Sequence, residues 1–196
     1  MKILPQSFYN RNTLKIARDL LGCFLARSFP NGTTGRFKIV ETEAYHGPRD
    51  LASHASRGRT PRNAVMFGAP GMIYVYFTYG MHYMLNIVTG EEGYPAAVLI
   101  RAVEEMRHET CGMKHETRKR LSTNGPAKLT KYLQIDKTFN GKPVFVKKYG
   151  LWIEDRERGI KPLVVRAARI GVDYAGEYKE KLWRFHVKGN GFVSRK

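Results

Sequence analysis

The stretch MIYVYFTYGMHYMLNIV, residues 72–88, decides the fold of this chain. Residues 72–77 and 83–88 are rich in aromatic and β-branched side chains, which favour strands. The short segment between them predicts an antiparallel hairpin with residues 79–81, Tyr-Gly-Met, at its tip. A hairpin turn is ordinarily polar, so the apolar bulk at this tip needs an explanation beyond the turn itself.

A second hairpin is predicted on the N-terminal side. Residues 23–29 and 36–45 have the period-two pattern of strands, and the sequence PNG at residues 30–32 is a strong turn signal. Before this hairpin, residues 13–21 carry apolar side chains at helical spacing and are followed by Gly22, which favours the end of a helix. One helix and one strand pair are therefore expected here.

The C-terminal part continues the mixed pattern. A helix is expected to begin at Pro126, because a glycine followed by a proline suits a helix start. Short strand-like runs follow at residues 144–147, 163–166 and 182–187. No repeat, linker or low-complexity segment divides the chain, so we predict a single α+β domain over residues 1–196 with a mainly antiparallel sheet.

The composition indicates an anionic partner. The chain has 34 Lys and Arg against 17 Asp and Glu, a formal charge of +17 that exceeds what solubility requires. The apolar segment at residues 72–85 is too short and too often interrupted to span a bilayer, and the N-terminus lacks the pattern of a secretory signal. Cys23 and Cys111 are too few for a disulfide framework. We therefore expect an intracellular protein in a reducing compartment.

The sequence predicts that two carboxylates continue an apolar strand face. Alternate residues of a strand share a face, so Phe37, Ile39, Glu41, Glu43 and Tyr45 are expected to line up. In the simplest interpretation the strand emerges into solvent at Glu41 and both carboxylates are solvated, as charged side chains usually are. The alternative is that the two carboxylates are functional.

Other chemistries fit these carboxylates less well. In glycosidases a carboxylate pair flanks the scissile bond, whereas neighbours at positions i and i+2 lie side by side. A metal site is a further alternative, but neither candidate set has a known zinc spacing or an Asp-rich composition. The two sets are Glu41, Glu43, His46 and His54, and His108, Cys111 and His115. We expect no metal site.

Arginine and aromatic side chains characterise the middle of the chain. No lysine occurs between Ile39 and Met113, so this region lacks the amine that a Schiff-base mechanism requires. Arginine instead suits forked phosphate contacts and a persistent charge beside a carboxylate. Packing explains most of the aromatic residues. An exposed Tyr79 flanked by Gly80 and Met81, however, fits the apolar wedge that opens a base step in DNA.

Five ordered segments carry a resemblance to a known family. They are IVETEAYHGPRDLASHASRGRTPRNAVMFGAPGMIYVYFTYGMHYMLNIV at residues 39–88, VLIRAVE at 98–104, NGPAKL at 124–129, AARIGVDYAGE at 167–177 and LWRFHVKG at 182–189. Together they cover most of the chain and resemble the alkyladenine (3-methyladenine, or methylpurine) DNA glycosylase family. The resemblance implies a curved, mainly antiparallel sheet with flanking helices and a protruding β-hairpin that inserts into DNA.

The resemblance also implies an activity and its catalytic residues. The enzyme would flip an alkylated or deaminated purine out of duplex DNA and hydrolyse its N-glycosidic bond without a cofactor. Glu43, in ETEAY, would be the general base that activates water, and Arg101, in VLIRA, would help to hold that water and keep Glu43 ionised. An ionised carboxylate can take a proton and stabilise an oxocarbenium-like sugar. Glu41 is a candidate leaving-group acid by proximity.

Further matched positions would bind the base and the DNA. The walls on which the base stacks would come from Tyr45, His54 and Tyr76. Asn86 would exclude guanine, and Leu99 would form the floor of the pocket. Tyr79 would fill the gap left by the flipped nucleotide. Groove and phosphate contacts would come from Thr60, Arg62, Met81, Tyr83 and Lys128, although residues 60–63 also fit a simple turn.

The expected partner is double-stranded DNA with damaged purines. We expect the protein to be a monomer that does not bind membranes. The expected lesions are 3-methyladenine, 7-methylguanine, hypoxanthine and ethenoadenine, and the expected location is the nucleoid in a bacterium or the nucleus in a eukaryote. A non-catalytic nucleic-acid-binding protein explains the charge equally well. It explains less well why Glu43 lies beside Tyr45 and why Tyr79 occupies a hairpin tip. A metal-dependent nuclease is the third alternative.

Overall fold

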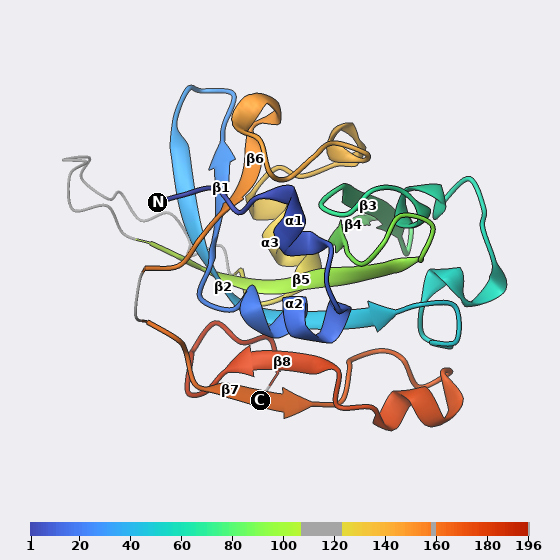
Figure 1. The fold of residues 1–196 in the computed structure, drawn as a ribbon. Coiled ribbons are helices and arrows are strands. Elements are labelled where there is room, and N and C mark those ends of the chain that lie inside the picture. Colours follow the sequence, from blue (N-terminus) through green and yellow to red (C-terminus); the bar gives the residue numbers. More distant parts are fainter. Residues whose placement is uncertain (107–122, 158–159, 196) are drawn as a thin grey trace.

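An antiparallel sheet of eight strands organises the molecule (Figure 1). The computed structural model describes residues 1–106, 123–157 and 160–195. The strands are β1 (Phe24–Ser28), β2 (Thr34–His46), β3 (Ile73–Thr78), β4 (His82–Val88), β5 (Ala96–Glu105), β6 (Leu151–Glu154), β7 (Val164–Ala167) and β8 (Arg184–Val187). Their order is β3-β4-β5-β2-β1-β6, and β8 pairs with β2 and with β7.

Short helices connect and cover the strands. The α-helices are α1 (Gln6–Tyr9), α2 (Thr13–Asp19) and α3 (Pro126–Tyr132). The single turns of 3-10 helix are η1 (His54–Arg57), η2 (Ala64–Phe67), η3 (Lys137–Phe139), η4 (Lys147–Tyr149) and η5 (Gly176–Glu180). Few helices and one curled antiparallel sheet confirm the α+β prediction. In the described part of the chain, no helix has the length and apolar character to cross a bilayer.

The main hydrophobic core covers one face of the sheet. Strand residues such as Val75 and Val98 pack there against Tyr9 from α1, Ile16 from α2 and Leu129 from α3. All five side chains are almost completely removed from solvent, and burial of this apolar area is the main stabilising contribution to the fold. The opposite face of the sheet carries a smaller buried cluster that includes Tyr74 and Ala97.

A bulge at Val40 divides the long strand β2. Ile39 pairs with Val103, and Glu41, two residues further on, pairs with the adjacent Ala102. Val40 is therefore an extra residue on β2, and the alternation of faces along the strand shifts by one position.

This bulge corrects one prediction from the sequence. Phe37 and Ile39 pack in the main core, and beyond the bulge Ala44 occupies the same core. Glu41 and Glu43 therefore lie on the opposite face of the sheet. The expectation that the carboxylates continue the face of Phe37 and Ile39 is wrong, because strict alternation does not survive an inserted residue.

Most predicted elements are confirmed, and one is wrong. The two hairpins, the helix at Thr13, the helix at Pro126 and the strands near residues 164 and 184 all form. The side chain of Asn12 accepts hydrogen bonds from the N–H groups of Leu14 and Lys15 and so caps α2.

The run at residues 144–147 is not a strand. Val144 instead accepts a hydrogen bond from the N–H of Ile153 and donates one to Gly71 in an irregular loop. The strand of this region is β6, which pairs with β1.

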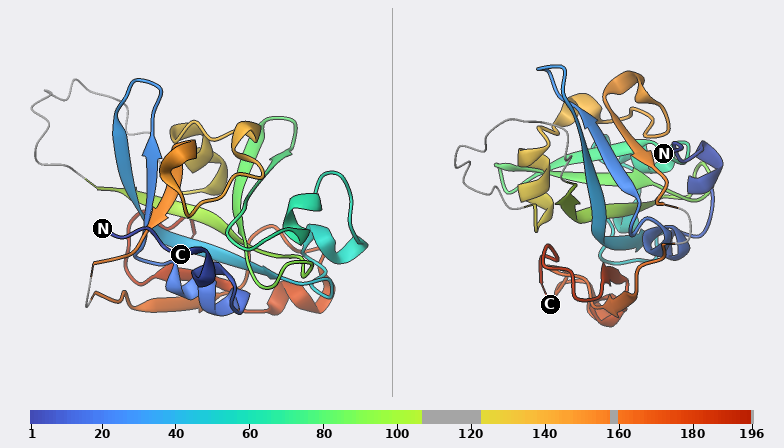
Figure 2. Two further views of the ribbon diagram at one scale, coloured as in Figure 1. Left: turned by 45° about the horizontal axis from the view of Figure 1, so that its top comes forward. Right: turned by 90° about the vertical axis from the view of Figure 1, so that its left-hand side faces the viewer.

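The β3–β4 hairpin ends in the predicted apolar tip. β3 ends at Thr78 and β4 begins at His82, and the left view of Figure 2 shows the green tip projecting from the sheet. Tyr79 is 83% exposed and has a φ of +51°, in the left-handed region that non-glycine residues seldom occupy. The fold therefore presents this aromatic ring to solvent at an energetic cost.

Candidate active site

Four directly opposed residues form a row across four strands. Glu43 on β2 pairs with Leu99 on β5, Leu99 with Asn86 on β4, and Asn86 with Tyr74 on β3. Directly opposed residues in an antiparallel sheet project from the same face. The row is at most 3% exposed, so a carboxylate, an amide and a phenol are buried together opposite the main core.

Glu43 is a buried carboxylate with three donors. Its Oε1 accepts a hydrogen bond of 2.8 Å from the N–H of Ile170, and its Oε2 accepts one of 3.0 Å from the hydroxyl of Tyr45. Nη1 of Arg101 lies 3.3 Å from Oε1. Because Glu43 is fully buried, the interpretation that this carboxylate is simply solvated is wrong.

Arg101 lies between the two glutamates. Ile100 pairs with Thr42 and Ala102 with Glu41, so Arg101 is an extra residue on β5 at this point. Nε of Arg101 lies 3.3 Å from Oε1 of Glu41, the same separation that joins the guanidinium to Glu43. This second bulge, on β5, thus places the guanidinium of Arg101 near both carboxylates.

Aromatic rings gather beside this row. The rings of His54 and Tyr76 are 4.4 Å apart and nearly perpendicular, and those of Tyr74 and Tyr76 are 5.4 Å apart. Nδ1 of His54 lies 3.1 Å from the hydroxyl of Tyr74. Burial, together with the nearby charge of Arg62, lowers the pKa of His54 to about 4. We call Tyr45, His54, Tyr74 and Tyr76 the aromatic cluster.

Tyr45 joins the aromatic cluster to the carboxylate. Burial raises its pKa well above 10, and the charge of Glu43 adds to this effect. Its ring lies 4.8 Å from the guanidinium of Arg169, which forms a cation–π contact. Tyr45 therefore remains a neutral phenol that donates to Glu43.

Asn86 has its amide nitrogen fixed. Nδ2 donates to the carbonyls of Tyr74 and Met84, at 3.2 and 3.3 Å. The side chain is nearly fully buried beside Leu99. Such a fixed amide can discriminate among ligands by shape and by hydrogen bonding.

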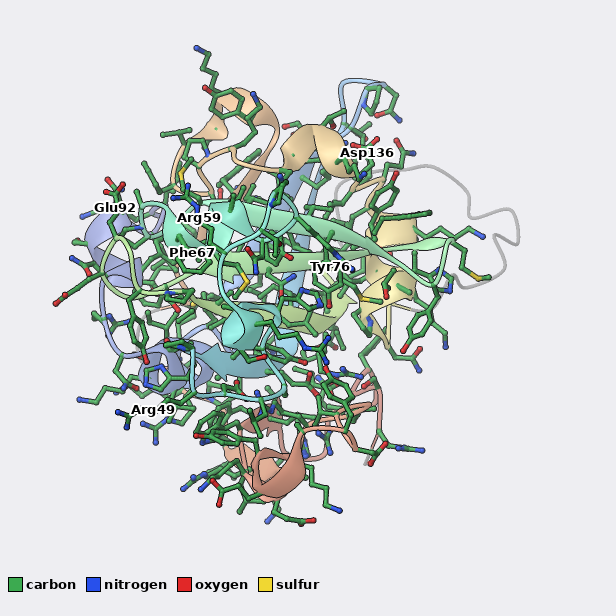
Figure 3. All side chains as sticks on the ribbon, turned by 90° about the vertical axis from the view of Figure 1, so that its right-hand side faces the viewer. Arg49, Arg59, Phe67, Tyr76, Glu92 and Asp136 are labelled. Atoms are coloured by element: carbon green, nitrogen blue, oxygen red, sulfur yellow. The ribbon has the colours of Figure 1, made fainter. Side chains whose placement is uncertain are left out.

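Arg62 and Thr60 belong to a loop that borders the aromatic cluster. The side chain of Asn63 accepts from the N–H of Thr60 and donates to the carbonyls of His54 and Gly58, so the predicted turn is present. The guanidinium of Arg62 donates a hydrogen bond to the carbonyl of Phe77 and lies 5.3 Å from the ring of Tyr76. Figure 3 views the molecule from the side that carries this loop and shows Tyr76 near the middle, with Arg59 and Arg49 to its left.

The remaining predicted contacts lie around the hairpin. Met81 is 68% exposed at the tip, whereas Tyr83 is half-buried and packs against the main core and the ring of Phe77. Lys128 is exposed on α3 and bonds to Asn124. The structure therefore places Met81 and Lys128 at the surface and Tyr83 partly within the core.

Several residues at this site were missed by the sequence analysis. They are Asp50, Arg169, Ile170, Arg184 and Ser194, which contact Glu41, Glu43, Tyr45 or one another. Three of them lie within the quoted motifs AARIGVDYAGE and LWRFHVKG. The available signal was an arginine in each motif, Arg169 and Arg184. The sequence does not indicate which residue either arginine contacts.

The metal alternatives gain no support. Among the described residues, no three His, Cys, Asp or Glu side chains are grouped so as to hold a metal ion. The set His108, Cys111 and His115 lies outside the described residues.

Comparisons with known proteins agree with the resemblance. The model of the methylpurine-DNA glycosylase (MPG) family matches residues 7–191. The chain belongs to the methylpurine-DNA glycosylase family. Relatives over the full chain carry the name "Putative 3-methyladenine DNA glycosylase", and three of them illustrate the similarity. The protein from Methanocella arvoryzae is 47% identical, over 100% of this chain and 98% of its own length.

The other two relatives match over a similar length. The protein from Carboxydothermus hydrogenoformans is 48% identical over 99% of this chain and 100% of its own length, and that from Desulfitobacterium hafniense is 42% identical over the full length of both. As a member of this family, the protein is a DNA N-glycosylase, a hydrolase of base-excision repair that acts on DNA. Membership of the family sets aside the non-catalytic binding protein and the metal-dependent nuclease.

Proposed function

We propose that this glycosylase releases alkylated or deaminated purines from duplex DNA, with Glu43 as the general base. The lesions are of the class of 3-methyladenine, 7-methylguanine, hypoxanthine and ethenoadenine. The observation that carries the proposal is a fully buried Glu43 that is bonded to Tyr45 of the aromatic cluster and paired with Arg101. The proposed base, Glu43, and one wall of the stacking surface, Tyr45, thus come from the same strand, β2.

The proposed reaction is a single displacement by water. Water attacks C1′ of the deoxyribose and gives a proton to the carboxylate of Glu43, while the N-glycosidic bond breaks and its electron pair leaves with the purine. Glu43 also stabilises the positive charge that develops on the sugar. Arg101 orients Glu43 and helps to hold the water. No amine or metal takes part in these steps.

The proposed base pocket uses the aromatic cluster. The damaged purine stacks on Tyr45, His54 and Tyr76, with Leu99 at the floor. Because the pKa of His54 is lowered to about 4, its ring is neutral at pH 7 and does not repel a cationic alkylpurine. Asn86 excludes the exocyclic amine of guanine through its fixed amide.

The proposed DNA interface follows the hairpin and the neighbouring loop. Tyr79 occupies the space of the flipped nucleotide, which its exposure and projection support. Phosphate and groove contacts are made by Thr60, Arg62, Met81, Tyr83 and Lys128. Arg62, Met81 and Lys128 are exposed, as such contacts require. Tyr83 would contribute from β4 close to the tip, where it pairs with Phe77. We propose that residues 1–196 act as one domain and as a monomer.

Base release from defined lesions tests this function. Duplexes with hypoxanthine, ethenoadenine or methylated purines are incubated with excess enzyme and chelator, and strand breaks are measured before and after hot alkali. We expect free purine and breaks that appear only after alkali treatment. Breaks before alkali would contradict a reaction with water as the sole nucleophile, and loss of activity with chelator would contradict the metal-free mechanism.

A further inference from the structure

We propose that Glu41 is a positioning residue for the reaction. It holds Arg101 midway between two carboxylates and ties this arrangement to the backbone at Ser194. The inference rests on the proposed role of Glu43 as general base. It assigns to Glu41 a role through Arg101, in place of direct proton donation to the leaving purine.

Glu41 is fully buried and its oxygens are occupied. Oε2 accepts a hydrogen bond of 2.7 Å from the N–H of Ser194. Oε1 accepts bonds of 3.0 Å from the hydroxyl of Ser194 and from Nη1 of Arg184, and Nε of Arg101 lies 3.3 Å away. A carboxylate with these donors is a buried acceptor, which is poorly arranged to donate a proton.

Ser194 reaches this position because residues near it are anchored. Arg184 on β8 donates to the carbonyl of Arg195 at 2.8 Å while it also bonds to Glu41. The hydroxyl of Ser194 lies 3.5 Å from Nη2 of Arg101. Glu41 therefore joins β2, β5, β8 and residues 194–195 in one network.

The guanidinium of Arg101 is shared between the glutamates. Its separations from Glu41 and Glu43 are both 3.3 Å, longer than the roughly 2.8 Å of a strong charge-assisted hydrogen bond. Glu41, Glu43, Arg101 and Arg184 together carry no net charge. Removal of the charge on Glu41 would leave this buried group at +1 and free Arg101 to pair with Glu43 alone.

Closer pairing would make Glu43 a weaker base. Tyr45 on β2, Arg101 on β5 and the N–H of Ile170 after β7 contact Glu43 directly. Arg184 on β8 lies opposite it in the sheet, and Tyr76 on β3 interacts with it electrostatically. Glu41 and Arg169 lie one contact further away, through Arg101 and Tyr45 respectively. Among these, Glu41 is the negative charge that competes with Glu43 for Arg101. A base held more tightly by a cation ionises at lower pH and accepts a proton less readily.

The variant Glu41→Gln tests this role. It keeps the shape of the side chain and removes the charge. We expect single-turnover excision at pH 7 to slow about tenfold, the acidic limb of the rate–pH profile to move down by about one pH unit, and DNA affinity to stay within about twofold. Glu41→Asp, which keeps the charge, should retain the acidic limb of the wild-type enzyme.

Glu154→Gln is the matched control. Glu154 is a glutamate on β6 that is 1% exposed and paired at 2.8 Å with the partly exposed Arg36, so its loss also removes the charge of a buried, ion-paired glutamate. We expect its rate and pH profile to match those of the wild-type enzyme. A general effect of losing a buried carboxylate would instead appear in both variants.

Several outcomes would overturn the inference. If Glu43→Gln is inactive but a folded Glu41→Gln variant has the wild-type rate and pH profile, the role of Glu41 is overturned. If Glu43→Gln is active, the proposed function itself is contradicted. If Glu41→Gln does not fold, Ser194→Ala replaces it, because that change removes the hydroxyl near both Glu41 and Arg101. A several-fold slower rate with unchanged binding is expected, and an unchanged rate would overturn the inference.

Discussion

Asp50 and Arg169 are joined by two hydrogen bonds, of 2.6 and 2.8 Å, although neither side chain is exposed. Arg169 also donates to the carbonyls of Ala44 and Tyr178 and lies over the ring of Tyr45. This ion pair therefore fixes the backbone of β2 and one wall of the aromatic cluster at the same time.

Removal of one partner of this pair should destabilise the protein. Asp50→Asn leaves the charge of Arg169 buried without a counter-ion, and we expect the free energy of unfolding to fall by about 3–5 kcal/mol. Urea denaturation measures the change. Asp19→Asn is the control, because the Arg11–Asp19 pair is about 40% exposed and should contribute less than about 1 kcal/mol. Equal effects of the two variants would contradict this account.

Buried tyrosines should make the protein sensitive to alkali. Burial raises the pKa of Tyr74 to about 12 and those of Tyr9 and Tyr45 well above 10. Above pH 10 the unfolded chain loses phenol protons that the folded protein keeps, so the free energy of unfolding falls as pH rises from 10 towards 12. Urea denaturation at pH 9 and pH 11 measures this fall. Tyr74→Phe should make it shallower, and an equal fall in this variant would contradict the prediction.

The exposed tip of the hairpin should act in DNA capture. Tyr79→Ser removes an aromatic surface that stacking on a base would stabilise by about 1–3 kcal/mol, so we expect the enzyme concentration for half-maximal rate to rise on the order of tenfold. Leu163→Ser is the control, because Leu163 is 74% exposed next to β7. If both variants bind lesion DNA like the wild-type enzyme, Tyr79 has no part in capture.

Asn86 should limit the choice of base. Asn86→Ala opens space beside Leu99, and we expect release of guanine from undamaged duplex DNA to rise about tenfold. Chromatography of the released bases measures this rate. Release of hypoxanthine should change less, because hypoxanthine lacks the exocyclic amine. An unchanged rate for guanine would show that another residue excludes it.

Local sequence patterns predicted the elements that depend on local physics. The β3–β4 hairpin and its tip follow from alternating aromatic and β-branched residues around Tyr79, and α2 follows from its cap and apolar stripe. The run at residues 144–147 failed because strand propensity depends on the partner. In this chain β1 pairs with residues 151–154 instead.

The surroundings of Glu43 could not be predicted in the same way. Ile170 is separated from it by 127 residues along the chain, and Ser194 is separated from Glu41 by 153. Such contacts are decided by the topology of the sheet and by the bulge at Val40. No turn or capping pattern in the sequence predicts that bulge. Sequence resemblance could name Glu43 and Arg101, but the sharing of Arg101 with Glu41 needed coordinates.

The most direct test of the central claim is single-turnover excision by Glu43→Gln. The substrate is the lesion duplex that the wild-type enzyme processes fastest, and Glu154→Gln serves as the control for loss of a buried glutamate. We predict a rate at least about 100-fold below that of the wild-type enzyme, with DNA affinity unchanged within about twofold. A Glu43→Gln variant that releases the damaged base at the wild-type rate would contradict the account.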